Sequence, residues 1–272
     1  MKGAAGINGQ LVVAQGLGKS YPRVRALAPL NLSIQEGERV ALAGPSGSGK
    51  TTLLYLMAGL VQPDQGHVAI AGRQMTELRP GKELARLVAV MHQGYDLVPQ
   101  LTVVHNVLAG RLGQWSLFHS LTSLVWPRER YLAEEALSRL GIGDKLHERT
   151  SRLSGGEQQR VAIARLMVQS SRVILADEPV SSLDPARAED MLKLLTGLVD
   201  SSDKALVASL HSPELIRKHF SRVIGLRRGV LQFDMPTTEL SDEVLERLYL
   251  LDSQDNQLDS QSPREAVAEI PR

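Results

Sequence analysis

Gly44-Pro-Ser-Gly-Ser-Gly-Lys50-Thr51 is the stretch that decides the fold of this chain of 272 residues. It follows the apolar run Arg39-Val-Ala-Leu-Ala43, which predicts a buried strand, and it precedes a run up to Leu60 that predicts a helix. Glycines between a strand and a helix let backbone N–H groups turn inward around phosphate oxygens, and the helix N-terminus adds a favourable dipole. The pattern G-x-x-x-x-G-K-[ST] therefore predicts a phosphate-binding loop in an α/β fold.

The residues of this loop suit the binding of ATP together with Mg²⁺. Lys50 would neutralise the β- and γ-phosphates, and the hydroxyl of Thr51 would ligate Mg²⁺. A glycine-rich turn without a ligand is the simpler interpretation, and the strand and helix that flank the loop argue against it. The predicted ATP-binding residues of the loop are Gly44, Pro45, Ser46, Gly47, Ser48, Gly49, Lys50, Thr51 and Thr52.

Two acids, Asp177 and Glu178, follow a second apolar run, Val173-Ile-Leu-Ala176, which also predicts a buried strand. An acid at the end of such a strand can hold the hydration shell of Mg²⁺, so Asp177 is a predicted metal ligand. Two adjacent acids can also be an ordinary solvated strand end. Lys50, as the balancing cation, favours the functional interpretation.

Leu153-Ser-Gly-Gly-Glu-Gln-Gln-Arg160 is the second informative stretch. Ser154 and Glu157 have the spacing of a capping box, which predicts a helix from Gly155 to Gln169. Small residues at a free helix N-terminus make an anion site, although this end is expected in a different lobe from the phosphate loop. Taken alone, Ser-x-x-Glu indicates only an ordinary capped helix.

The chain between these stretches changes character. From about residue 95 to residue 153 the pattern predicts helices, at 103–112, 117–125 and 127–140, inserted into an α/β core. Further strands are predicted at 11–14, 30–34, 67–71, 87–91 and 205–209, and a helix at about 186–198. The expected organisation is a flexible segment 1–10, one domain 11–251 with its core at 11–94 and 159–251 and its helical part at 95–158, and a disordered tail 252–272.

The order of these motifs resembles that of ATP-binding-cassette (ABC) ATPases, because few other ATPases carry both the phosphate loop and the LSGGQ-type stretch. The resemblance covers about residues 11–250 and implies a P-loop NTPase (RecA-like) core with an antiparallel β-subdomain and an inserted α-helical subdomain. It also implies Mg²⁺-dependent ATP hydrolysis. In such a protein the LSGGQ-type helix of one copy faces the γ-phosphate held by a second copy, so a homodimer is expected.

The resemblance assigns the remaining site residues. Glu178 would be the general base that polarises the attacking water. His211, after the strand 205–209, would contact the γ-phosphate and that water, and Tyr21 would stack on adenine. Gln93 would reach the Mg²⁺ ion or the water, as both a catalytic residue and a metal ligand. The residues expected to act across the dimer are Ser154, Gly155, Gly156 and Asp184.

Within the family the chain is most similar to phosphonate-importer ATPases, through stretches at 101–113, 177–187 and 222–229. This similarity implies a separate transmembrane permease, which is expected to dock on the groove between the core and the helical insert, near residues 93–101 and 103–125. It also implies an indirect periplasmic or surface substrate-binding protein, and a peripheral location on the cytoplasmic face of the bacterial inner membrane. Alternatives are an ATPase of an amino-acid or phosphate-type importer, of a lipoprotein-release or exporter system, or a soluble ABC ATPase of DNA repair or translation.

Composition narrows these alternatives. Lys and Arg total 31 against 30 Asp and Glu, a net charge of +1 that argues against nucleic acid as a partner. The chain has no cysteine, which excludes disulfides and thiolate metal sites. No apolar run approaches the roughly 18 residues of a membrane-spanning helix, and the first ten residues do not form a secretory signal. Any work at a membrane is therefore expected to go through a partner.

Overall fold

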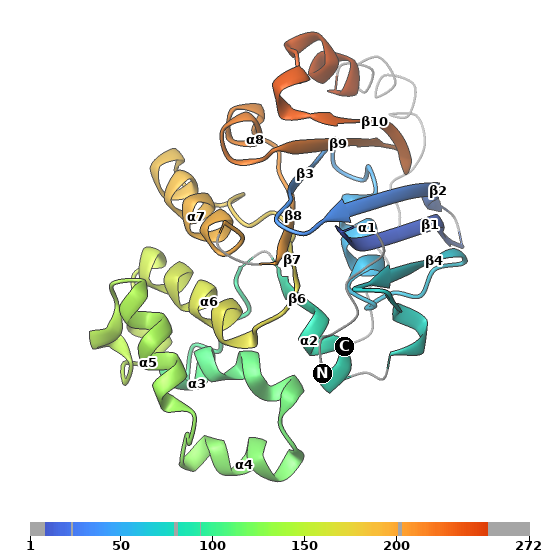
Figure 1. The fold of residues 1–272 in the computed structure, drawn as a ribbon. Coiled ribbons are helices and arrows are strands. Elements are labelled where there is room, and N and C mark those ends of the chain that lie inside the picture. The colour runs from blue at the N-terminus through green and yellow to red at the C-terminus, as the bar shows by residue number, and fades with distance from the viewer. Residues whose placement is uncertain (1–8, 23, 79–80, 93, 201–202, 250–272) are drawn as a thin grey trace.

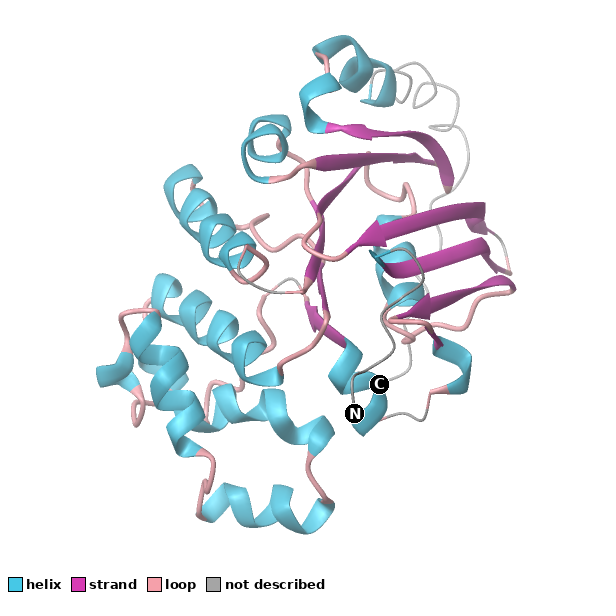
Figure 2. Cartoon of the chain, in the orientation of Figure 1, coloured by secondary structure: helices cyan, strands magenta, loops and turns pink. Residues whose placement is uncertain are grey.

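The computed structural model describes residues 9–22, 24–78, 81–92, 94–200 and 203–249. It contains two β-sheets and a lobe of helices that projects from one side of the larger sheet (Figures 1 and 2). The expected flexible residues 1–8 and the expected tail 252–272 lie outside the described residues. Gln10, by contrast, begins the first strand and so belongs to a sheet.

The larger sheet forms the core, and in the described residues its strand order is β10-β9-β3-β8-β7-β6. β3, β6, β7, β8 and β9 run parallel, and β10 is antiparallel at the edge. The strands are β3 (Arg39–Ala43), β6 (Val88–Met91), β7 (Val173–Ala176), β8 (Ala205–Ser209), β9 (Arg222–Arg227) and β10 (Val230–Pro236).

Successive side chains of the central strands enter two different cores. Val173 and Leu175 pack with the antiparallel sheet and the first helix, whereas Ile174 and Ala176 pack with the helical lobe. This alternation follows from the two-residue period of a strand. Because both faces are covered, the central strands are apolar except at their ends, as the sequence predicts.

The second sheet is antiparallel, with strand order β2-β1-β4-β5, which confirms the predicted β-subdomain. Its strands are β1 (Gln10–Tyr21), β2 (Val24–Gln35), β4 (Gln65–Ile70) and β5 (Arg73–Gln74). β1 and β2 are far longer than the predicted strands at 11–14 and 30–34. The extra residues are mostly polar or exposed, but Leu17 and Leu27 among them are buried in the core, and ladder hydrogen bonds hold the rest in the sheet.

The helical lobe is built from α3 (Val103–Leu108), α4 (Leu117–Val125), α5 (Arg130–Arg139) and α6 (Gly155–Gln169). α6 has the predicted bounds and the predicted capping box, and it packs on α3 and α5. The expected boundary between residues 158 and 159 therefore falls inside one continuous helix. The predicted helix 127–140 starts later, at Arg130, because residues 127–129 form a turn closed by Arg130 N–H on the Pro127 carbonyl (3.1 Å).

The predicted helix 103–112 also ends early. α3 stops at Leu108 and continues as a 3₁₀ helix, Ala109–Gln114. Gly110 lies so close to α6 that an added Cβ would sit 2.4 Å from the Arg165 carbonyl oxygen, and a Cβ added at Gly113 would sit 2.6 Å from the Cβ of Ala85. The two glycines let this tighter segment approach its neighbours more closely than any larger residue would.

Four further helices complete the core: α1 (Lys50–Met57), α2 (Lys82–Leu87), α7 (Pro185–Gly197) and α8 (Pro213–His219). α1 ends before the predicted Leu60, and residues 242–249 form another helix at the end of the described chain. Figure 1 shows α6 and α7 on one side of β6, β7 and β8, with α1 on the other side. Within the described residues, none of the helices is long and apolar enough to cross a membrane.

Candidate functional site

The phosphate loop leaves β3 at Gly44 and enters α1 at Lys50. Gly44, Gly47 and Gly49 have φ angles of 147°, 76° and 102°, a region that favours glycine. At Gly44 an added Cβ would lie 2.0 Å from the Leu226 carbonyl oxygen, so no larger residue fits there. The glycine spacing of the sequence is therefore required by the path of the backbone.

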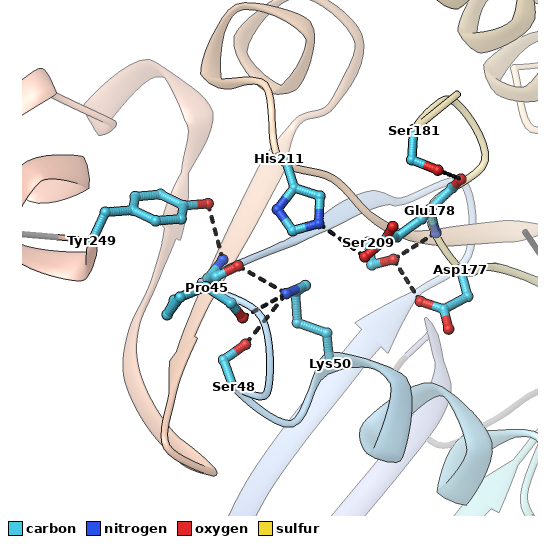
Figure 3. A network of polar contacts seen from close by, with 10 residues as sticks. Pro45, Ser48, Lys50, Asp177, Glu178, Ser181, Ser209, His211 and Tyr249 are labelled. Atoms are coloured by element: carbon cyan, nitrogen blue, oxygen red, sulfur yellow. Dashed lines mark hydrogen bonds and ion pairs between the residues drawn. The ribbon is translucent and has the colours of Figure 1, made fainter. Parts of the chain in front are cut away.

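Lys50 is buried, with 5% of its surface exposed, and its ammonium group points back at the loop. Its Nζ donates to the carbonyl oxygens of Gly44 (2.8 Å) and Pro45 (3.0 Å), as Figure 3 shows. Burial lowers the pKa of Lys50, and the charges of Glu178 and, to a smaller extent, Asp177 oppose that shift. The cation is thus held at the loop by uncharged oxygens and faces two acids across the site.

Those two acids are linked through Ser209, at the end of β8. The Ser209 hydroxyl donates to Oδ1 of Asp177 (2.7 Å) and accepts the backbone N–H of Glu178 (2.7 Å). Ser209 is completely buried. Sequence reasoning did not single it out, although a polar residue that ends an otherwise apolar strand was a usable signal.

Glu178 and His211 meet above the phosphate loop. Nε2 of His211 lies 2.9 Å from Oε1 of Glu178, in hydrogen-bond contact (Figure 3). Glu178 has a φ of 47°, which costs a non-glycine residue of the order of 1–3 kcal/mol. The hydrogen bond from Glu178 N–H to the Ser209 hydroxyl helps to hold this conformation.

A hollow of about 310 Å³ lies in front of the loop. It is lined by Val24, Ala26, Ser46, Gly47, Ser48, Gly49, Lys50, Thr51, Thr52 and Glu178. Nothing lies within 4 Å of the position that a Cβ of Gly47 would take, so the backbone there is open to a ligand. Loop N–H groups, a helix N-terminus and a buried lysine together fit the phosphates of a nucleotide. The Thr51 hydroxyl and the Asp177 carboxylate are oxygen ligands of the kind that Mg²⁺ accepts alongside phosphates and water.

The LSGGQ-type residues are not part of this hollow. Ser154 begins α6, its side chain caps Glu157 N–H (3.3 Å), and both Ser154 and Gly155 are exposed. Asp184 caps α7 through Arg187 N–H (3.1 Å). Among the residues that line the hollow there is none from either helix start, so one chain does not bring its two predicted halves together.

Two predicted residues stand apart from the rest. Tyr21 ends β1, is 46% exposed, and has the Lys19 ammonium 5.6 Å from its ring centroid. It does not line the phosphate hollow. Gln93 lies outside the described residues.

The loop that follows Gln93 is clamped by α6. Gly94, Tyr95 and Asp96 all have positive φ, at 87°, 67° and 48°. Arg165 of α6 donates to the carbonyls of Tyr95 (2.6 Å) and Asp96 (2.9 Å). Burial lowers the pKa of Arg165, and the charge of Asp96 offsets only part of that shift. The helix that carries the LSGGQ-type stretch is therefore bound directly to this loop.

A fully buried amide makes a second connection. Asn106 of α3 accepts from Val98 N–H (2.8 Å) and donates to the Val98 carbonyl (3.0 Å) and the Thr150 hydroxyl (2.8 Å). Thr150 precedes the LSGGQ-type stretch by three residues. Asn106 thus connects the chain after Gln93 to the chain before Leu153.

Fold and site together define a phosphate-loop ATPase with a helical lobe inserted into its core. The ABC transporter family model matches residues 27–181, more than half of the chain. The chain belongs to this family, and it is a nucleotide-binding subunit that hydrolyses ATP.

Curated relatives are similar over nearly the whole chain. A phosphonates import ATP-binding protein PhnC 2 of Pseudomonas aeruginosa (strain UCBPP-PA14) is 45% identical over 250 residues, covering 91% of this chain and 94% of the relative. A phosphonates import ATP-binding protein PhnC of Pseudomonas putida (strain KT2440) is 44% identical over 236 residues, covering 86% of this chain and 88% of the relative.

Solved structures agree in fold. The ADP conformation of MJ1267, an ATP-binding cassette, matches with a TM-score of 0.74 and 21% identity, covering 93% of this chain and 99% of that one. MJ0796, a bacterial ABC transporter cassette solved as a dimer, matches with a TM-score of 0.71 and 29% identity, covering 84% of this chain and 99% of that one.

Proposed function

We propose that this chain powers the import of phosphonate, or of a related phosphorus oxyanion, through a separate permease. The observation that carries the proposal is the 45% identity to a phosphonates import ATP-binding protein, which extends over 91% of the chain. An identity confined to the ATPase motifs would favour no particular transported solute. Here it includes the helical lobe, the part expected to meet the permease.

We propose that the loop from Gly44 to Thr52 holds the phosphates of ATP, with Lys50 between the β- and γ-phosphates. Lys50 would exchange the carbonyls of Gly44 and Pro45 for phosphate oxygens. Thr51, Asp177 and Gln93 would hold Mg²⁺, which neutralises charge that develops on the phosphates. Tyr21 would supply a stacking surface for adenine, because its ring is exposed and stands at the end of its strand.

For hydrolysis we propose Glu178 as the general base and His211 as its partner. The two side chains already touch at 2.9 Å, and Glu178 also lines the phosphate hollow. A water between the carboxylate and the γ-phosphate would lose its proton to Glu178 as it attacks. The buried Ser209 holds Asp177 and the Glu178 backbone in register, and Gln93 would complete the set.

The second half of the site would come from a second copy of the chain. Ser154, Gly155 and Gly156 offer a free helix N-terminus, yet they are absent from the hollow of their own chain. In an antiparallel pair each helix end would face the γ-phosphate on the partner's Lys50, with Asp184 nearby. The dimeric MJ0796 cassette, at 29% identity, supports such a pair.

We further propose that the permease docks on the helical lobe, at the cytoplasmic face of the membrane. The outer face of α4 presents Leu117, Phe118 and Leu121 to solvent, with Leu117 79% and Phe118 78% exposed. Clustered apolar surface of this kind is typical of an interface with another protein. Leu97 and Trp115, although in the expected region, pack against the core and serve its stability first.

The decisive experiment is reconstitution. The chain is coexpressed with a phosphonate-type permease, inserted into vesicles, and its ATPase rate is measured with the binding protein loaded or empty. We expect phosphonate-loaded binding protein to raise the rate. Stimulation by an amino acid in place of phosphonate would overturn the proposed substrate and leave the ATPase assignment intact.

A further inference from the structure

The helix formed by residues 242–249 reaches the phosphate loop from the far end of the chain. Leu245 and Leu248 are buried in the core that also contains Ile174 and Ala176, and they fix the helix in place. Tyr249 follows them and is itself partly buried. Its hydroxyl oxygen accepts a hydrogen bond from the backbone N–H of Gly44 (3.2 Å), as the left side of Figure 3 shows.

Gly44 is the residue at which the loop departs from β3, and it is closely surrounded. The Leu226 carbonyl and the Ser48 hydroxyl lie so near that no Cβ fits. Its own carbonyl oxygen accepts from the Lys50 ammonium at 2.8 Å. The Tyr249 hydroxyl and the Lys50 ammonium therefore bind the N–H and the C=O of one residue.

The hydrogen bond between Tyr249 and Gly44 is largely shielded from solvent. Burial raises the pKa of Tyr249, and the Gly44 N–H opposes that shift. The phenol therefore stays neutral at physiological pH and serves as a fixed acceptor. A buried backbone N–H without such an acceptor would be costly, because it has given up its hydrogen bonds to water.

The same C-terminal segment also holds the helix that follows His211. Arg217 of α8 donates to the Leu240 carbonyl (3.1 Å) and pairs with the Asp242 carboxylate (2.5 Å). α8 begins at Pro213, two residues after His211. One short stretch, residues 240–249, thus contacts both the phosphate loop and the helix that follows His211.

We propose that Tyr249 is a positioning residue for ATP: its hydroxyl fixes Gly44, and through Gly44 the resting place of Lys50 and the start of the phosphate loop. The inference rests on the proposed assignment of the phosphates to this loop. Because Tyr249 touches the loop and not the attacking water, it affects ATP affinity and leaves the chemical step unchanged.

The test is Tyr249→Phe in the full-length chain, which removes the hydroxyl and keeps the ring. Affinity for ATP is measured by titration calorimetry, and the ATPase rate is followed over a range of ATP concentrations. We expect a dissociation constant and KM about 3- to 10-fold higher, the size of one neutral hydrogen bond, with kcat within about twofold of the parent. The Gly44 amide proton should move upfield in the NMR spectrum of the variant.

Two further variants make the result decisive. Tyr131→Phe, a tyrosine in the helical lobe that is 62% exposed, is the matched control and should leave both constants unchanged. Lys50→Ala separates this inference from the assignment of the site. If Lys50→Ala abolishes ATP binding and Tyr249→Phe binds normally, Tyr249 has no positioning role. If Lys50→Ala binds ATP normally, the site assignment itself fails. A fall in kcat with unchanged KM in Tyr249→Phe would indicate a purely structural role and would also overturn the inference.

Discussion

The phosphate-loop end of the core and the α4 end of the helical lobe satisfy their surfaces in opposite ways. At the phosphate loop, polar atoms are paired with one another: Lys50 with loop carbonyls, Ser209 with Asp177, and His211 with Glu178. At α4, large apolar side chains such as Phe118 have no cover. A paired polar site suits a small charged ligand that exchanges one set of hydrogen bonds for another. A broad apolar face, by contrast, is removed from water only when a macromolecule covers it.

The largest effect is expected from Lys50→Ala, which tests the polar end. Removing the ammonium leaves the β- and γ-phosphates without their cation, so ATP hydrolysis should fall to background. The fold should persist, because Lys50 belongs to neither hydrophobic core cluster. Steady-state ATPase assays and circular dichroism check both points, with the exposed Lys82→Ala as the matched control. Normal turnover in Lys50→Ala would remove the phosphate-loop assignment.

Glu178→Gln should separate hydrolysis from closure of the dimer. The amide keeps the shape of the carboxylate and the contact with His211 but cannot take a proton from water, so ATP should remain bound and a dimer should accumulate. Sizing chromatography with ATP measures this directly. Adding Ser154→Arg introduces a bulky cation at the partner's γ-phosphate and should return the protein to monomer. A Glu178→Gln protein that stays monomeric with ATP would count against a site shared between two copies.

The apolar end is tested by Phe118→Asp, with a smaller effect on the enzyme itself. A charge in the middle of a docking face should abolish stimulation by the permease, while basal ATP hydrolysis stays at the parent level. Leu60→Asp is the matched control, because Leu60 is also exposed, at 56%, but lies in the core lobe after α1. Pull-down of the permease and stimulated ATPase rates provide the two measurements. An equal loss of permease-stimulated ATPase activity in both variants would show that the α4 face is not the docking surface.

The smallest effect on function is expected at the buried amide of Asn106, which connects the chain after Gln93 to the chain before Leu153. Asn106→Ala leaves Val98 N–H and the Thr150 hydroxyl without their buried partner, which should lower the free energy of unfolding by about 2–3 kcal/mol. For a chain of this size that corresponds to a fall in Tm of roughly 4–12 °C. Asn31→Ala, which removes one exposed hydrogen bond to Gly16 N–H, should change Tm far less. Calorimetric unfolding compares the two.

Local signals predicted α6 and the strand before Asp177 better than the antiparallel sheet. The capping box at Ser154 and the buried strand before Asp177 have the predicted bounds, because short-range spacing determines them. The length of β1 was missed, since its outer residues gain order from neighbouring strands, which the sequence does not reveal locally. Ser209 and Tyr249 were missed for a similar reason: their partners lie 32 and 205 residues away.

The exposed face of α4 also determines how the free subunit behaves in solution. Leu112 to Pro127 contains no Asp, Glu, Lys or Arg, so this face carries no charge to keep two molecules apart. Where the proposed permease is lacking, the subunit presents this uncharged apolar surface to solvent, and its solubility should fall as its concentration rises. Balanced synthesis of the two components is then a condition of colloidal stability as well as of transport.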